Sequence, residues 1–117
     1  QDILEQKPFE DAIAVAGYPV DIHHAKGGDC TMLFCEDAYQ IPYGVLVPQT
    51  IEGLLVAGRC ISTDRQALAS LRVMASCMGT GQAAGAAAAQ CVANNQTVHQ
   101  IDSEILVKTL RELGALV

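Results

Sequence analysis

Residues 53–93 read GLLVAGRCISTDRQALASLRVMASCMGTGQAAGAAAAQCVA and carry most of the information about the fold. A continuous apolar run at 54–57 predicts a strand buried on both faces, and Gly58 permits the sharp turn that leaves it. After a polar loop, the sequence predicts a long helix over 73–93. A strand, a turn and a helix whose N-terminus faces an anion suit a phosphate-bearing or electron-accepting cofactor.

The predicted long helix consists mainly of small residues. Each glycine inside a helix costs roughly 1 kcal/mol relative to alanine, yet Gly79, Gly81 and Gly85 fall within seven residues. Close packing best explains this choice, because small side chains let another backbone or a flat ligand approach the helix. We expect the helix to end at Asn94–Asn95, since asparagine tolerates the left-handed conformation.

The composition allows one domain and argues against a nucleic-acid partner and against a membrane span. The 117 residues are 50% hydrophobic and carry a formal net charge of −6. We expect no nucleic-acid partner, because phosphate contacts need a basic face. No stretch has the length and hydropathy of a membrane span, and no secretory signal is recognisable. Five cysteines without a CxxC pair indicate reduced thiols and a cytoplasmic location.

One segment is basic against this acidic background. Arg59, Arg65 and Arg72 fall within fourteen residues that contain a single acid, which gives a local charge of +2 (three minus one). We expect this segment, predicted as a loop, to face an anion, with the backbone N–H groups of Val73 and Met74 presented to the ligand. The alternative at this point is an ordinary buried helix preceded by solvated arginines.

The first half of the chain is expected to be mostly extended. Apolar residues at helical spacing between Pro8 and Gly17 predict a short helix over 8–17. Pro42 cannot donate to a ladder, so the segment around it is an edge strand or a crossing segment. We expect extended segments at 18–24, 31–35 and 39–47, with turns at 26–29 and 36–37.

The last predicted element is a C-terminal helix. Asp102 is its expected cap, Glu104 lies in its first turn and Gly114 follows its end. Its buried stripe is expected to consist of three leucines, Leu106, Leu110 and Leu113.

Two adjacent histidines offer further candidate chemistry. His23 or His24 facing a substrate pocket suits proton transfer, because imidazole titrates near neutral pH. A zinc site that combines them with Cys30 and Cys35 has no familiar ligand spacing, and we predict no metal. A surface or hydrogen-bonded histidine is the plainer alternative. The catalytic residues therefore stay open, with His23 as the candidate.

Several segments in combination resemble the C-terminal part of FAD-dependent oxidoreductases of the type with two dinucleotide-binding domains. The likeness extends roughly over residues 17–114. Tyr18 to His23 is similar to the Asp-Ile-His segment of that family. The other segments that carry the resemblance are YQIPY at 39–43, LLVAGRCIS at 54–62, SLRVM at 70–74 and GQAAG at 81–85.

The resemblance implies a fold class and a set of cofactor-binding residues. The fold would be α/β, a mixed α+β fragment that forms the C-terminal portion of an FAD/NAD(P)-binding Rossmann-like domain. It would contain a few short strands, the Gly/Ala-rich helix and the C-terminal helix. Gly58 and Arg59 would lie near the ribityl chain and pyrophosphate of FAD. Arg72, Val73 and Met74 would lie beside the flavin ring.

The resemblance also implies how the chain is organised. Residues 1–50, with the short helix, would belong to a substrate-side β segment, and residues 51–117 to the C-terminal part of the FAD-binding domain. His23 and residues 39–43 would lie on the substrate side. Gly44 replaces the basic residue expected after Ile-Pro-Tyr.

The implied function is hydride transfer between FAD and a small-molecule substrate in a longer enzyme. No GxGxxG loop follows a strand here, so we expect an incomplete FAD site and no activity from this segment alone. The segment would self-associate or pack on the missing dinucleotide-binding domain. Two alternatives stay open: a non-enzymatic interaction module that docks through its small-residue helix, and a degenerate flavoprotein fragment.

Overall fold

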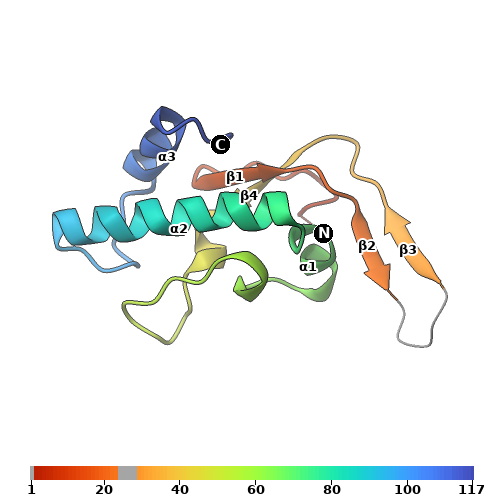
Figure 1. The fold of residues 1–117 in the computed structure, drawn as a ribbon, viewed down its shortest axis with the longest axis horizontal. Helices are drawn as coiled ribbons and strands as arrows, with labels where there is room; N and C mark the ends of the chain where they lie inside the picture. The colour runs from red at the N-terminus through yellow and green to blue at the C-terminus, as the bar shows by residue number, and fades with distance from the viewer. Residues whose placement is uncertain (1, 24–28) are drawn as a thin grey trace.

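The computed structural model describes residues 2–23 and 29–117 of the chain. Its longest element, α2 (Met74–Asn94), runs along the long axis of the molecule (Figure 1). The predicted long helix is thereby confirmed. Asn95 ends it in the left-handed conformation, with a φ of 52°, as its side chain allows.

A two-stranded antiparallel sheet lies along α2. It pairs β1 (Ala12–Ala16) with β4 (Tyr39–Pro42), and its register shifts between Ala12 and Ala14. The helix predicted over 8–17 is therefore wrong. Alanine favours a helix, but pairing with a distant strand overrides both this propensity and the local spacing.

Small residues hold β1 and α2 together. A Cβ added at Gly79 would lie 3.2 Å from the Cβ of Ala14, closer than side chains normally approach. This contact explains one of the three helix glycines. The buried core on either side of it includes Ile13, Ile41, Leu46, Ala83, Ala87, Leu106 and Leu110.

The second sheet is a hairpin that projects from one end of the molecule (Figure 1). β2 (Val20–His23) pairs antiparallel with β3 (Cys30–Leu33), which confirms the extended segments expected there. All four residues of β3 are exposed. His24 and most of the turn predicted at 26–29 lie outside the described residues.

The segment predicted to be extended over 39–47 is extended only as far as Pro42. Residues Tyr43–Leu46 form a 3₁₀ turn, which buries both the phenol of Tyr43 and Leu46. The Tyr43 hydroxyl donates to the carbonyl of Val98 at 2.9 Å. The Tyr39 hydroxyl is hydrogen-bonded to that of Ser70, so both phenols are satisfied inside the core.

The strand predicted at 54–57 forms no ladder with any described residue. The N–H of Val56 donates to the carbonyl of Leu46 at 2.8 Å, and Leu54 is 40% exposed. A strand needs a neighbour, and apart from a local turn bond to Ala57 a single backbone hydrogen bond joins this segment to the rest of the described chain. The strand prediction is therefore wrong for this structure.

The segment predicted as an arginine-bearing loop contains a helix, α1 (Arg65–Leu71). Asp64 is its N-cap, and the Asp64 carboxylate accepts a hydrogen bond from the N–H of Ala67 at 2.7 Å. The sequence holds this capping signal together with good helix formers, so the loop prediction missed a recognisable start.

The C-terminal helix is confirmed as α3 (Ser103–Glu112), with Asp102 as its cap. Leu106 and Leu110 are fully buried, but Leu113 is 62% exposed, so the predicted leucine stripe is wrong at its last position. Leu113 follows the last helical residue, where the chain turns through Gly114 with a φ of +80°. The helical spacing no longer applies there.

The described elements give a mixed α/β fold with short strands, as predicted, and three α-helices, of which α2 and α3 were predicted and α1 was not. Both described sheets are antiparallel pairs, so the Rossmann-like assignment stays a prediction, as does the division at residue 50. Within the described residues, no helix combines the length and apolar character needed to cross a membrane. All five cysteines are free thiols.

Two leucines, one in α3 and one just after it, provide a test of the core. Leu110→Ala should lower the free energy of unfolding by about 2–5 kcal/mol, because it opens a cavity at a fully buried site. Leu113→Ala, in the same region but exposed, should change it by less than about 0.5 kcal/mol. Urea denaturation measures both. Equal effects of the two substitutions would contradict the burial described here.

The buried phenol of Tyr43 predicts a loss of stability at alkaline pH. Burial raises the pKa of Tyr43 from 10.0 to about 12. Between these values the unfolded chain loses the phenolic proton while the folded chain keeps it, so stability falls as pH rises. The loss should reach roughly 2 kcal/mol. Tyr43→Phe should flatten this fall in urea denaturation; an unchanged slope would refute the assignment.

Candidate functional site

The start of α2 offers unpaired backbone donors. Val73 is the N-cap and makes no side-chain capping bond, and the first turn holds no acidic residue. The first N–H that bonds back into the helix is that of Cys77, which donates to the carbonyl of Val73 at 3.0 Å. The N–H groups of Met74, Ala75 and Ser76 therefore have no acceptor within the helix. This end of the helix carries partial positive charge suited to an anion or a carbonyl oxygen.

The Gly58 turn is hydrogen-bonded to the same helix. Gly58 has a φ of +63°, a conformation that favours glycine, and begins the 3₁₀ turn Gly58–Cys60. Its N–H donates to the Thr80 hydroxyl at 3.0 Å, and that hydroxyl donates to the carbonyl of Ser76 at 2.9 Å. A buried threonine thus ties the turn to α2. No sequence motif marks Thr80 as a site residue.

The side chain of Arg72 extends to the second sheet. Its Nη2 donates to the backbone carbonyl of Asp21 at 3.2 Å and lies 3.5 Å from Asp21 Oδ2. His23 Nε2 lies 3.1 Å from the same carboxylate oxygen, and the His23 side chain is 67% exposed. Asp21 therefore brings two predicted site residues together. Asp21 lies inside the Tyr18 to His23 segment, but an aspartate at this position does not by itself indicate a site residue.

These side chains surround a pocket of about 230 Å³. It is lined by Arg59, Arg65 and Arg72, with Asp21 and His23 from β2. The pocket unites three predicted site residues, namely Arg59, Arg72 and His23. Gly58, Val73 and Met74 do not line it. The side chain of Met74 is 83% exposed at the start of α2.

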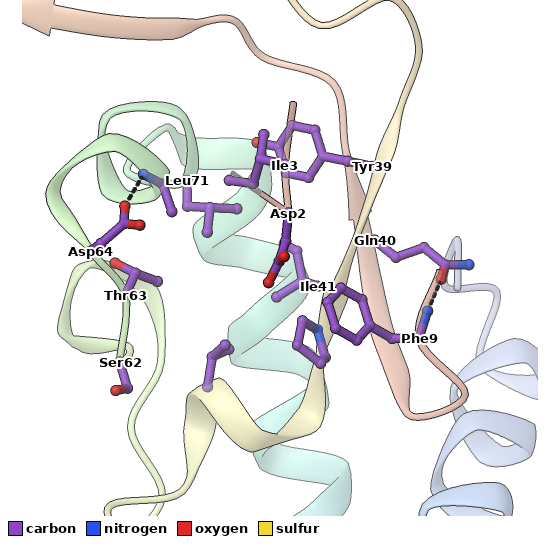
Figure 2. Close-up of a pocket in the computed structure, with 13 residues that line it drawn as sticks. Asp2, Ile3, Phe9, Tyr39, Gln40, Ile41, Ser62, Thr63, Asp64 and Leu71 are labelled. Atoms are coloured by element: carbon purple, nitrogen blue, oxygen red, sulfur yellow. Dashed lines mark hydrogen bonds between the residues drawn. The ribbon is translucent and has the colours of Figure 1, made fainter. Parts of the chain in front are cut away.

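A second, mainly apolar pocket of about 180 Å³ lies between β4, α1 and the N-terminal segment (Figure 2). The N–H of Phe9 donates to Gln40 Oε1 at 2.7 Å beside it. Tyr39 contributes its ring to the lining, whereas Tyr43 does not line it. The buried Thr63 hydroxyl has no hydrogen-bond partner within the described structure. The pocket is an apolar recess with a few polar groups at its edge.

A glycine turn beside an uncapped helix N-terminus is an arrangement that proteins use to bind anionic cofactors. A family model described as "FAD dependent oxidoreductase" matches residues 1–113. The match covers nearly the whole chain, and the chain therefore belongs to this family of flavoprotein oxidoreductases. Neither a curated protein nor a solved structure matches it.

The start of α2 offers donors of the kind that the cofactor implied by the family would need. The first turn offers backbone N–H groups, carries no carboxylate and is flanked by an exposed Met74. A flavin ring needs donors for its carbonyl oxygens and an apolar surface against its face. Both are present at this helix end.

The bond between Gly58 and Thr80 can be tested directly. Thr80→Val keeps the shape but leaves the Gly58 N–H without its acceptor, which should cost about 1–3 kcal/mol of unfolding free energy. Thr109→Val is the matched control, because the Thr109 hydroxyl only donates to the carbonyl of Ile105. Urea denaturation and hydrogen exchange of the Gly58 amide measure the effect. Unchanged protection of that amide in Thr80→Val would contradict the bond.

Proposed function

We propose that this chain forms one side of the flavin site of an FAD-dependent oxidoreductase that catalyses hydride transfer. The N–H groups at Met74 and Ala75 would hold the carbonyl edge of the flavin ring. The Gly58–Arg59 turn would lie on the ribityl side. The observation that supports this most directly is the start of α2, which has neither a side-chain cap nor an acidic residue in its first turn.

The role of this segment is electrostatic. Bound FAD supplies the hydride chemistry in the complete enzyme. The helix end would stabilise negative charge next to Met74 by roughly 0.3–2 kcal/mol. For a two-electron couple about 1.4 kcal/mol corresponds to about 30 mV, so the effect on the reduction potential should be tens of millivolts. The segment therefore tunes the cofactor and positions it.

The remainder of the FAD site would come from a dinucleotide-binding part of the full-length enzyme, packed on the free face of α2. Met78 and Val92 are 75% and 84% exposed on this helix. A Cβ added at Gly81 or Gly85 would meet no described atom within 4 Å. The glycines thus leave room that the described chain does not fill.

The other properties follow from this role. The substrate would be a small molecule bound on the side of His23, and five free thiols support a cytoplasmic location. The segment alone would lack the phosphate-binding loop and hence activity. The exposed face of α2 would also suit an interaction module without enzymatic activity. The next experiment distinguishes this alternative from a flavin site.

The charge at position 74 tests the flavin assignment in the full-length protein. Met74→Glu places a carboxylate in the first turn, where it favours the helix but opposes a negatively charged flavin. We expect weaker FAD binding and a potential lower by tens of millivolts than in Met74→Gln, the neutral control of the same shape. Flavin absorbance after reconstitution and spectroelectrochemical titration measure these quantities.

Two results would count against the proposal. A full-length protein that stays colourless after reconstitution with FAD would favour the interaction module. Equal reduction potentials and FAD affinities in Met74→Glu and Met74→Gln would show that the start of α2 does not contact the flavin.

A further inference from the structure

The pocket between α1, the Gly58–Cys60 turn and β2 contains more positive charge than the described chain neutralises. Three guanidinium groups line it, and Asp21 is the one carboxylate among its lining residues. The excess is therefore +2 (three minus one), without counting His23. The whole chain has a formal net charge of −6, so this concentration runs against its composition.

The three arginines differ in how they are paired. Arg72 shares the carboxylate of Asp21 with His23. Arg65 reaches a backbone carbonyl, that of His23, at 3.5 Å. Arg59 has no hydrogen bond or ion pair within the described part of the chain. Two guanidinium groups thus face the pocket without a counter-charge from the residues that the structure describes.

We propose that this pocket binds a compact oxyanion, the carboxylate or phosphate group of the substrate. Guanidinium groups present planar pairs of donors that match both kinds of oxyanion. The volume of about 230 Å³ is below the roughly 300–1,000 Å³ of pockets for drug-sized ligands, so it suits one charged group or a small acid. Arg65 is the central residue, because nothing in the flavin assignment involves it.

The position of the pocket relates the anion to the flavin site. Arg72 lines the pocket, and the next residue, Val73, is the N-cap of α2. An oxyanion held by Arg72 and Arg65 would therefore lie beside the helix end that faces the cofactor, with His23 at the rim. The identification of the anion as part of the substrate rests on the proposed flavin function, whereas the binding of an anion does not.

Calorimetric titration of the full-length, FAD-loaded protein with inorganic phosphate and with malonate tests the proposal. We expect at least one anion to bind, and Arg65→Gln to weaken it roughly tenfold or more, through the lost charge-assisted bonds. Arg111→Gln is the matched control, because Arg111 lies on α3, away from the lining residues, and contacts the carbonyl of Val117. Malonamide, which has the shape of malonate without its charge, should not bind.

The outcomes separate this proposal from the flavin assignment. Preference for phosphate indicates a phosphorylated substrate, and preference for malonate a carboxylic acid. A protein that contains FAD but binds neither anion overturns the oxyanion pocket and leaves the flavin function intact. Equal weakening by Arg65→Gln and Arg111→Gln also overturns it, because the attraction would then be a general charge effect. A full-length protein that binds an anion but takes up no FAD would support the oxyanion pocket and refute the flavin site.

Discussion

The close contact between α2 and β1 is the constraint on which the other elements depend. Gly79 lies so near Ala14 that one added methyl group would crowd it, so the helix axis is held against the strand. The core residues of α3 and β4 then pack around this contact. Because α2 is rigid over 21 residues, fixing it at Gly79 also fixes its N-terminus, five residues away. The candidate site is thereby positioned by a contact between small residues.

Residues 72 and 73 divide the site into two sides. The side chain of Arg72 turns toward Asp21 on β2, whereas the backbone after Val73 begins the helix with its free donors. A helix end attracts a delocalised negative charge weakly, and guanidinium groups bind an oxyanion through directed hydrogen bonds. One dipeptide thus joins two electrostatic environments of different strength and geometry. This arrangement suits a cofactor edge next to a charged group.

The sequence predicts those elements whose signals are local. α3 carries a capping aspartate and α2 a left-handed asparagine stop, and the predicted bounds of both helices lie close to the observed ones. The local spacing predicts a helix over 8–17, because the partner that makes 12–16 a strand lies more than twenty residues further along. Segment 54–57 has strand composition, but the described chain supplies no ladder for it. Strands depend on neighbours, and single-sequence patterns describe neighbours poorly.

The candidate site follows the same rule. A local concentration of arginines was visible in the sequence, and the structure gathers all three around one pocket. The partner of Arg72 was not visible, because Asp21 lies 51 residues earlier and its type is common on surfaces. The role of Thr80 was equally hidden, since a threonine inside a helix is usually read as a weak helix former. The sequence thus predicts which charges are available, whereas their pairing depends on how α1, α2 and β2 pack. Because Arg72 is already paired and Arg59 and Arg65 are not, the latter two supply the free charge of the pocket.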